Sequence, residues 1–266
     1  MKKILCMLLI LALCAALCGC GGSAREVVTV TTLVEQDYSL AFRTGDPTAY
    51  YVAAAIEVLN AQGLVDELSV KWFGSRLVNF GSNASALENL GPVEPRSFNI
   101  GVDINSFPMA YITGGQYWGF DIELATAVCE LLHWDLKIQP IEKENVYIEL
   151  SSGNIDCAWG GIALNPEDIS AGRITQYGPY IHNDIVIAKR GDAFIENKYM
   201  LSHKALAMCS TQEAMDALQT DPGIVDRLGQ ISRLAGGTTE CFQYLYQGRC
   251  DVILTDSTAI YYFNCH

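Results

Sequence analysis

The sequence predicts an α/β protein built around parallel strands, and three observations support this prediction. Short apolar strands alternate with helices, as in the strand at 98–102, the helix at 121–132 and the strand at 155–159. The alternation returns farther along, with strands at 205–209 and 250–255. Hydrophobic residues make up 50% of the 266 residues and charged residues 18%, which is sufficient for a packed core and excludes wholesale disorder. A chain of this length accommodates one large domain or two lobes.

Two helices and a linker precede the first of these strands. Asp46 and Pro47 predict a helix start, with the aspartate as N-cap and the proline at the first helical position, and Gly63 ends this helix. A second, short helix is expected at 64–72. Glycine, proline, serine and asparagine recur through 74–97, which indicates a linker.

Helix signals also follow the later strands. Ser210 and Glu213 are three residues apart directly after the strand at 205–209, and this spacing predicts a capping box that opens a helix. Similar signals predict a helix at 145–152, a strand at 184–189, and helices at 239–246 and 257–263.

The first twenty residues have the pattern of an export signal. Two lysines follow Met1, and an uncharged apolar stretch then runs from 4 to 17, shorter than the roughly 20 residues that cross a bilayer as a helix. The residues before Cys20 resemble the lipobox of bacterial lipoproteins. We therefore expect a signal peptide at 1–19, lipidation at Cys20 and a tether at 20–25, with stable membrane anchoring through the lipid. The alternative is an ordinary secretory peptide with incidental cysteines.

Charge and motif content exclude several functions. A formal net charge of −13 argues against nucleic-acid binding, which depends on neutralised phosphates, and against a polybasic membrane patch. No two cysteines after Cys20 form a CxxC pair, which argues against zinc. The sequence contains no GxSxG, HExxH, GxGxxG, Walker or EF-hand motif. We therefore expect neither a metal nor a cofactor, and no enzymatic activity.

A set of short motifs in a fixed order resembles one protein family. The motifs are Gly101-Val102-Asp103, Phe107-Pro108, the run from Gly119 to Ala125, Ser152-Gly153-Asn154-Ile155-Asp156, Gly178-Pro179-Tyr180, Ser210-Thr211, and Gly248-Arg249-Cys250-Asp251 leading to Asp256. Their order and spacing over 98–263 are similar to the family 3 solute-binding proteins of polar amino-acid ABC transporters. The resemblance implies a periplasmic-binding-protein-like fold of type II, with two α/β lobes joined by a two-segment hinge. It also implies capture of a polar amino acid outside the membrane and delivery to a permease.

Residues 26–73 are similar to the end of that family, although here they precede the rest. In ordinary members this stretch follows the segment that here finishes at His266, so the chain resembles a circularly permuted member. Lobe 1 is then expected at 38–182, including a permutation linker at 74–97, and lobe 2 at 26–37 plus 188–266. The alternative is that residues 26–95 form an unrelated domain added to a truncated binding protein, which would leave an open sheet edge.

The resemblance implies roles for individual residues. Asp256 accepts the α-ammonium of the ligand, and Ser210 and Thr211 hold its α-carboxylate. The other residues expected at the ligand are Asp103, Phe107, Lys143, Gly160, Gly161, Ala163, Asp168 and Arg173. The same positions also have structural explanations, because Ser210 belongs to the capping box and Asp256 stands where it would cap the next helix. Asp103 equally fits a turn at the end of a strand.

Several positions depart from the pattern of the family. Asn-Pro-Glu-Asp stands at 165–168 where the family has Thr-Pro-Glu-Arg, so Asp168 cannot clamp a carboxylate as arginine does. Arg173 lies nearby and is a candidate substitute. Lys143 stands where an aromatic residue usually covers the ligand, and Ala163 replaces a serine or threonine. Together with the excess of acidic over basic residues in the chain, these changes favour a cationic amino acid or an amine as ligand.

Other functions are compatible with the same fold. An enzyme such as a dehydratase, a regulatory part of a cell-wall lyase or a sensor module is the alternative to a transport receptor. For the leading hypothesis we expect a monomer outside the cell membrane, anchored through lipid and recognised by an ABC transporter permease.

Overall fold

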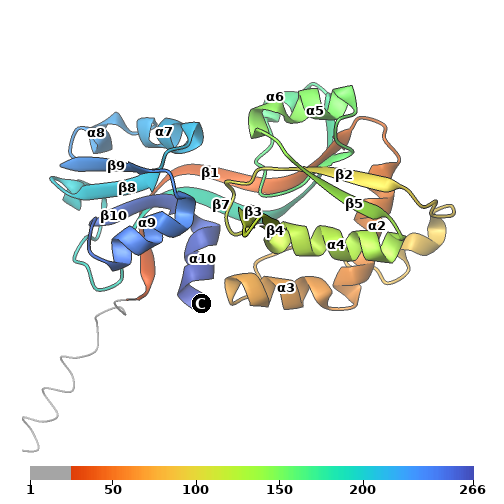
Figure 1. Ribbon diagram of the computed structural model, residues 1–266, viewed down its shortest axis with the longest axis horizontal. Coiled ribbons are helices and arrows are strands. Elements are labelled where there is room, and N and C mark those ends of the chain that lie inside the picture. Colours follow the sequence, from red (N-terminus) through yellow and green to blue (C-terminus); the bar gives the residue numbers. More distant parts are fainter. Residues whose placement is uncertain (1–24) are drawn as a thin grey trace, which may run out of the picture.

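The computed structural model describes residues 25–266, so Cys20 and the expected signal peptide lie outside the described residues. Two α/β lobes lie side by side and share one eight-stranded sheet (Figure 1). The strands are β1 (Val27–Arg43), β2 (Ser97–Val102), β3 (Tyr111–Thr113), β4 (Gln116–Trp118), β5 (Asp135–Pro140), β6 (Cys157–Ala158), β7 (Ile174–Arg190), β8 (Ala205–Cys209), β9 (Gln230–Leu234) and β10 (Val252–Asp256). The helices are α2 (Thr48–Ala61), α3 (Leu64–Phe73), α4 (Phe120–Leu132), α5 (Val146–Ser152), α6 (Pro166–Ser170), α7 (Gln212–Gln219), α8 (Pro222–Val225), α9 (Gly237–Tyr246) and α10 (Ser257–Cys265), with short 3-10 helices η1 (Ala86–Asn89), η2 (Lys143–Asn145) and η3 (Lys198–Leu201).

Two long strands, β1 and β7, run through both lobes. They pair antiparallel from Val27 opposite Arg190 to Arg43 opposite Ile174. The register shifts at three places, between Thr29 and Thr31, between Thr32 and Val34, and between Tyr38 and Leu40. The first lobe adds β6, β2 and β5 on one side of this pair, and the second lobe adds β10, β8 and β9 on the other. Within each group of three the paired strands are parallel, which confirms the predicted α/β class.

Two strands differ most in length from the sequence prediction. The predicted strand at 184–189 is only the end of β7, which begins at Ile174 because pairing with β1 carries it through polar residues. The predicted strand at 155–159 is shorter, and only Cys157 and Ala158 lie in the ladder as β6. Trp159 still donates its backbone N–H to the oxygen of Gly101, at 2.8 Å.

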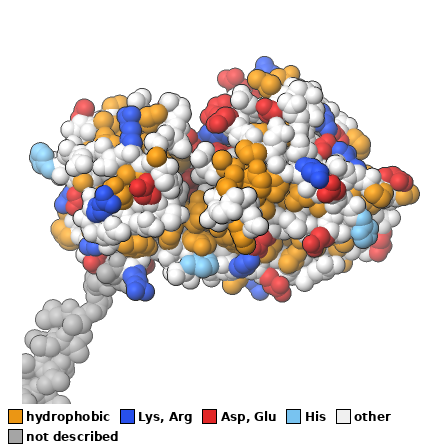
Figure 2. Space-filling model, viewed as in Figure 1, with side chains coloured by type: hydrophobic (Ala, Val, Ile, Leu, Met, Phe, Trp, Pro, Cys, Tyr) orange, Lys and Arg blue, Asp and Glu red, His pale blue; other side chains and the backbone are white. Residues whose placement is uncertain are grey.

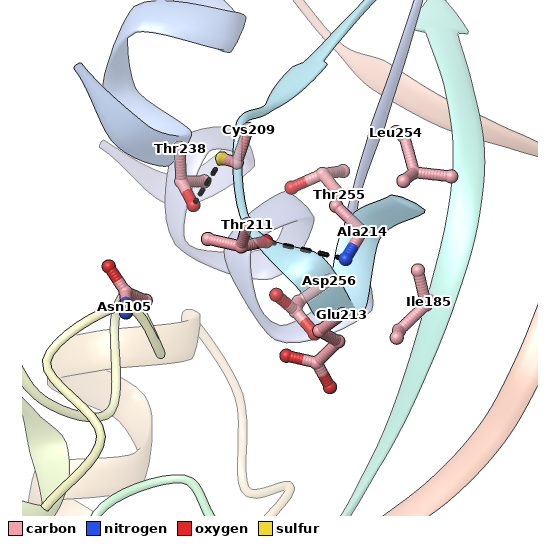
Figure 3. Close-up of a pocket in the computed structure, with 10 residues that line it drawn as sticks. All are labelled: Asn105, Ile185, Cys209, Thr211, Glu213, Ala214, Thr238, Leu254, Thr255 and Asp256. Atoms are coloured by element: carbon pink, nitrogen blue, oxygen red, sulfur yellow. Dashed lines mark hydrogen bonds between the residues drawn. The ribbon is translucent and has the colours of Figure 1, made fainter. Parts of the chain in front are cut away.

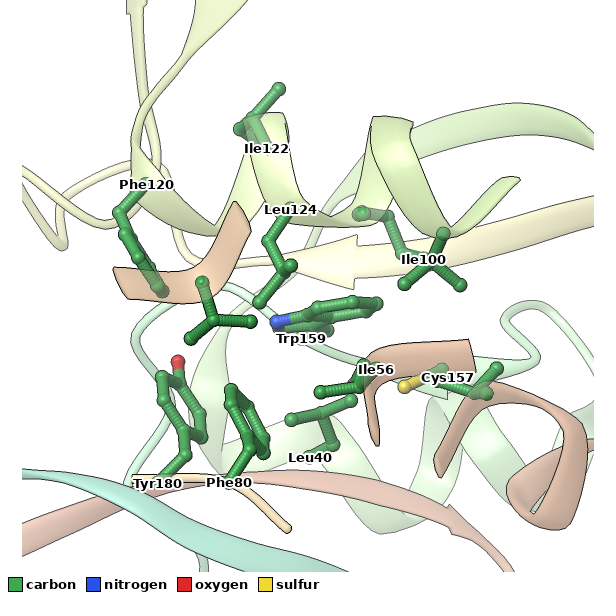
Figure 4. Close-up of a cluster of buried hydrophobic side chains, with 14 of the residues drawn as sticks. Leu40, Ile56, Phe80, Ile100, Phe120, Ile122, Leu124, Cys157, Trp159 and Tyr180 are labelled. Atoms are coloured by element: carbon green, nitrogen blue, oxygen red, sulfur yellow. The ribbon is translucent and has the colours of Figure 1, made fainter. Parts of the chain in front are cut away.

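The core of the first lobe combines residues from both sides of the 74–97 segment (Figure 4). Leu40 and Ile56 precede this segment, and both pack in one buried cluster with Ile100, Phe120 and Trp159. Helices α2, α3 and α4 cover one face of the sheet, and α5 and α6 cover the other (Figure 1). The residues before the segment therefore contribute directly to the core of this lobe.

The second lobe brings the two ends of the described chain together. Val27, at the start of β1, donates its N–H to Asn264 Oδ1 on α10 (2.8 Å), and Asn264 Nδ2 donates back to Val27 O (2.9 Å). Helices α9 and α10 lie on one side of the sheet, and α7 and α8 on the other (Figure 1). Within residues 25–266, none of the helices combines the length and apolar character that crossing a membrane requires.

Candidate functional site

A pocket lined by both polar and apolar residues lies between the two lobes (Figure 3). The ends of β8 and β10 and the starts of α7 and α9 form its wall in the second lobe, and Asn105 faces it from the first lobe. The lining residues are Asn105, Ile185, Cys209, Thr211, Glu213, Ala214, Thr238, Leu254, Thr255 and Asp256. On the face shown in Figure 2, a notch separates the lobes. Open α/β sheets bind ligands at the carboxyl ends of their parallel strands, so this pocket is the candidate site.

Asp256 ends β10 and is held by both strands that cross between the lobes. Tyr38 on β1 donates its hydroxyl to Asp256 Oδ1 (3.2 Å), and Asn183 on β7 donates its side-chain amide to the same oxygen (2.7 Å). Burial, and next the nearby carboxylate of Glu213, raise the pKa of Asp256 to about 7. Asp256 stands at the N-cap of α10, but its side chain makes no capping hydrogen bond. Its carboxylate lines the pocket instead (Figure 3).

An ion pair joins the two lobes beside this carboxylate. Lys143, on η2 of the first lobe, contacts the carboxylate of Glu213, in the first turn of α7 of the second lobe. Beyond the effect of burial, the Lys143 ammonium favours the ionised forms of Asp103 and Asp256, whereas Glu213 opposes them. Glu213 is therefore a member of the site that the sequence prediction missed, because its spacing from Ser210 already had an explanation as a capping box.

That capping box is wrong. Thr211, not Ser210, is the N-cap of α7, and its Oγ1 accepts a hydrogen bond from the N–H of Ala214 (3.3 Å). Ser210 is exposed and donates its backbone N–H to the oxygen of Leu234 (3.0 Å). With Thr211 as the N-cap, Glu213 is one residue short of the position that closes a capping box, and its carboxylate pairs with Lys143 across the cleft. Thr211 consequently lines the pocket, and Ser210 does not.

Asp103 follows β2 on the first-lobe side of the cleft. Its side chain is buried, and its Oδ1 accepts a hydrogen bond from the N–H of Asn105 (2.9 Å). Burial raises the pKa of this carboxyl group. Asp103 thus shapes the turn that presents Asn105 to the pocket, and it adds a carboxyl group within electrostatic reach of Lys143.

Gly161 is fixed by a buried carboxylate. Its N–H donates to Asp121 Oδ2 (2.7 Å), and Asp121 also accepts from Trp159 Nε1 (3.1 Å) and from the Tyr180 hydroxyl (2.6 Å). Burial raises the pKa of Asp121 to about 7. The φ of Gly161 is +64°, and a Cβ there would lie 2.6 Å from Cβ of Ser106. The backbone amide of Gly161 is therefore engaged inside the first lobe.

Phe107 belongs to an aromatic cluster between the lobes. Its ring centroid lies 4.8 Å from those of Tyr111 and Tyr262, and 5.5 Å from that of Phe263. Because Tyr262 and Phe263 lie on α10, this cluster packs the loop after β2 against the second lobe. Phe107 also lines a second pocket, which shares Asn105, Cys209, Thr211 and Thr238 with the first.

The remaining predicted residues lie around a third hollow or in the loop after β6. Lys143, Ala163 and Asp168 line the third hollow. Asp168 forms an ion pair with Arg173 (2.8 Å), so the arginine is already engaged. Among the predicted residues, the first pocket is lined by Thr211 and Asp256, and it is not lined by Asp103, Phe107, Lys143, Gly160, Gly161, Ala163, Asp168, Arg173 or Ser210.

Two α/β lobes that are joined by two long strands and flank a pocket have the architecture of a cleft-type binding protein. Residues 98–224 match the model of the bacterial extracellular solute-binding proteins, family 3. The match over this segment confirms the resemblance to the family and the type II periplasmic-binding-protein-like fold expected from the sequence.

Comparison with individual proteins gives more distant similarities. The chain is 26% identical over 147 residues to the membrane-bound lytic murein transglycosylase F of Shewanella sediminis (strain HAW-EB3), covering 54% of this chain and 27% of that protein. It therefore spans about a quarter of the length of this curated relative. Two solved structures are also similar. One is a polar amino acid ABC uptake transporter substrate binding protein from Streptococcus thermophilus, with 28% identity, coverage of 60% of this chain and 61% of that chain, and a TM-score of 0.45. The other is an ABC uptake transporter substrate binding protein from Streptococcus pneumoniae with bound histidine, with 26% identity, coverage of 61% and 66%, and a TM-score of 0.46.

Proposed function

We propose that the protein is the substrate-binding component of an ABC importer and captures a cationic amino acid by closing its two lobes. The observation that carries this proposal is the charge of the cleft. Asp103, Glu213 and Asp256 bring three carboxyl groups to it, and Lys143 brings one ammonium. A ligand that carries its own positive charge compensates this excess, and complementary charge favours both encounter and specificity.

Asp256 is the proposed acceptor for the α-ammonium of the ligand. Tyr38 and Asn183 both donate to Oδ1, which leaves Oδ2 as the oxygen for an ammonium group. A cation beside a carboxyl group favours its ionised form, so ligand binding would lower the raised pKa of Asp256. Because its two donors lie on β1 and β7, this anchor is attached to the segments about which the lobes move.

The two residues of the ion pair between the lobes, Lys143 and Glu213, are the proposed partners of the other two charged groups of the ligand. A cationic amino acid would replace the contact between Lys143 and Glu213. Its carboxylate would bind Lys143 and the hydroxyl of Thr211, and its cationic side chain would bind Glu213. This assigns to Lys143 the role that Arg173 does not fill, since Arg173 is paired with Asp168. Contacts from both lobes to one ligand stabilise the closed arrangement, which is the form a permease would recognise.

A thermal-shift screen tests the ligand class. We expect L-arginine and L-lysine to raise the unfolding temperature more than L-glutamine does, and L-glutamate to have no effect. A ligand at 100 times its dissociation constant stabilises the folded state by about 2.7 kcal/mol, which is easily resolved. A shift with L-glutamate alone, or with none of these amino acids, contradicts the proposal.

The location of the protein is part of the same proposal. Lipidation of Cys20 would tether the chain outside the cell membrane as a monomer, within reach of a permease. Mass spectrometry of the protein from the membrane fraction should detect the lipid on Cys20. The variant Cys20→Ala cannot carry this lipid and should be released from the membrane.

The similarity to a lytic murein transglycosylase favours a second candidate, an activity on the cell wall or its regulation. Lys143 and Glu213 are paired with each other, and Asp256 accepts hydrogen bonds from Tyr38 and Asn183. These groups are not arranged as an acid and a nucleophile. We therefore expect purified protein to release no soluble fragments from peptidoglycan. Release that Asp256→Asn abolishes would favour the enzyme instead.

We further propose that the chain order is permuted relative to the family. The support is the pairing of Val27 with Asn264, which puts the start of β1 beside the end of α10, and the shared core of the first lobe. A reordered variant tests this. It begins at Arg96, runs to His266, and continues through a short glycine-serine linker into residues 26–74. We expect cooperative unfolding and the same ligand preference; a reordered chain that does not fold contradicts the proposal.

A further inference from the structure

Two cysteines lie side by side at the wall of the pocket. Cys209 ends β8, Cys241 lies in α9, and their sulfur atoms are 3.8 Å apart. The sulfur of Cys209 also lies 3.8 Å from the hydroxyl of Thr238. A dashed line marks this contact in Figure 3. Both cysteines are free thiols. Because a disulfide needs a sulfur separation of about 2.0 Å, the two sulfur atoms would have to approach each other by roughly 1.8 Å to form one.

The two thiols differ in accessibility and acidity. Cys209 is partly exposed and lines both pockets, whereas Cys241 is fully buried. Hydrogen bonds from Cys241 and then Thr238 lower the pKa of the Cys209 thiol. The neighbouring Cys209 sulfur and burial raise the pKa of Cys241. Since the thiolate is the nucleophile, an incoming reagent would react first at Cys209.

We propose that Cys209 and Cys241 form a reversible dithiol–disulfide site whose substrate is a low-molecular-weight disulfide. The Cys209 thiolate attacks one sulfur of the disulfide, forms a mixed disulfide and releases the first thiolate. Cys241 then loses its proton and attacks the sulfur of Cys209, which releases the second thiolate. The protein dithiol is oxidised to a disulfide, and the small disulfide is reduced to two thiols.

The position of this site connects it to the cleft. Cys209 directly precedes the Ser210-Thr211 pair, and the start of α9, including Thr238, lines the second pocket. Bond formation would draw the sulfur of Cys209 from the pocket wall toward the buried Cys241 and fix the end of β8 to α9. The inference rests on the geometry of the two thiols and holds whichever ligand the cleft binds.

Oxidised glutathione is the probe that tests the proposal. The folded, full-length protein is incubated with it, digested without reduction and analysed by mass spectrometry. We expect a peptide pair linked through Cys209 and Cys241 that dithiothreitol separates. In Cys241→Ser the resolving thiol is missing, so glutathione should remain attached to Cys209. In Cys209→Ser the buried Cys241 should stay unmodified.

Two controls make the outcome decisive. Cys250→Ser removes another buried thiol and should keep the linked peptide. Treatment in urea should modify the buried cysteines, which shows that the reagent is competent. A folded wild-type protein that remains unmodified at Cys209, or a Cys241→Ser variant without glutathione at Cys209, overturns the proposal. A link from Cys209 to a different cysteine overturns it as well.

Discussion

Lys143 and Glu213, 70 residues apart in the sequence, form an ion pair that spans the cleft between the two lobes. Since η2 and α7 belong to different lobes, the pair is a contact that opening of the cleft would break. It also occupies the charges that a cationic amino acid would use. The pair is therefore an internal competitor of the proposed ligand.

Replacement of Lys143 should change the affinities for amino acids and for amines in opposite directions. In Lys143→Met the ligand carboxylate loses its partner, so we expect affinity for L-arginine to fall about tenfold, equivalent to about 1.4 kcal/mol. Agmatine, which lacks the carboxylate, should bind more tightly because Glu213 is released. Glu213→Gln should weaken both ligands. Isothermal titration calorimetry measures these affinities.

Lys137→Met is the matched control for this experiment. Lys137 is also paired with a carboxylate, that of Asp135 at 2.7 Å, but on the exposed surface of the first lobe. We expect this variant to bind both ligands as the wild type does. Equal losses for L-arginine and agmatine in Lys143→Met would contradict the exchange of partners.

Asp256 should make ligand binding pH-dependent. Its pKa in this structure is raised to about 7, and only the ionised carboxylate accepts an ammonium group strongly. We therefore expect affinity to increase as the pH rises through about 7 and then to level off. Asp256→Asn should lower affinity about 100-fold, within the roughly 2–5 kcal/mol typical of a truncated buried charge pair, and should remove the pH dependence. Titration of the variant at several pH values checks both effects.

Asp121 should make the stability of the protein depend on pH in the opposite sense. Its folded pKa is raised to about 7, above the value of about 3.9 expected in the unfolded chain. Between these values the folded state binds more protons, so the free energy of unfolding decreases as the pH rises from about 4 to about 7. Asp256 contributes in the same direction in the absence of ligand.

Asp121→Asn isolates the contribution of this residue. The variant directs an amide group toward donors from Gly161, Trp159 and Tyr180, so we expect destabilisation of about 1–3 kcal/mol. The slope of stability against pH should also become smaller. Urea unfolding near pH 5 and near pH 8 measures both quantities; an unchanged slope would show that Asp121 does not take up a proton on folding.

Gly161 is expected to tolerate no side chain because of its surroundings. Gly161 and Gly172 have φ values of +64° and +66°, but a Cβ on Gly161 would lie 2.6 Å from Ser106, whereas one on Gly172 meets nothing within 4 Å. Gly172→Ala should cost about 1–2 kcal/mol for the left-handed backbone alone. Gly161→Ala should cost about 1–3 kcal/mol more, because the added atom overpacks the core. Thermal unfolding of the two variants tests the difference.

Local patterns predicted most of the fold, and their success has a physical basis. The strand at 205–209 is apolar and bounded by polar residues, and β8 has these bounds. The lengths of β1 and β7 could not be predicted in the same way. Their central parts contain Gln36, Asp37 and Asn183, and they are strands because each pairs with the other across a long sequence separation.

The site was predicted less completely than the fold. Of the residues that the resemblance implied at the ligand, Asp256 and Thr211 line the pocket, and their roles toward a ligand stay predictions. Glu213 was missed because a capping box explained its position locally, whereas its partner Lys143 lies in the other lobe. Arg173 was considered as a carboxylate clamp, but Asp168, five residues away, holds it in a local ion pair. Local patterns do not reveal which of two competing partners a charged side chain takes.

The pairing of β1 with β7 has a consequence for how the cleft opens. The lobes are connected by a hydrogen-bonded ladder rather than by loose single segments, so opening must bend or twist this ribbon as a unit. Resistance to bending is lowest where regular pairing is interrupted. Of the three interruptions in this ladder, the one between Tyr38 and Leu40 involves the residue whose hydroxyl holds Asp256. If the ribbon bends there, Tyr38 connects the bending point to the proposed ligand anchor, and a ligand bound to Asp256 would act directly on the axis of rotation.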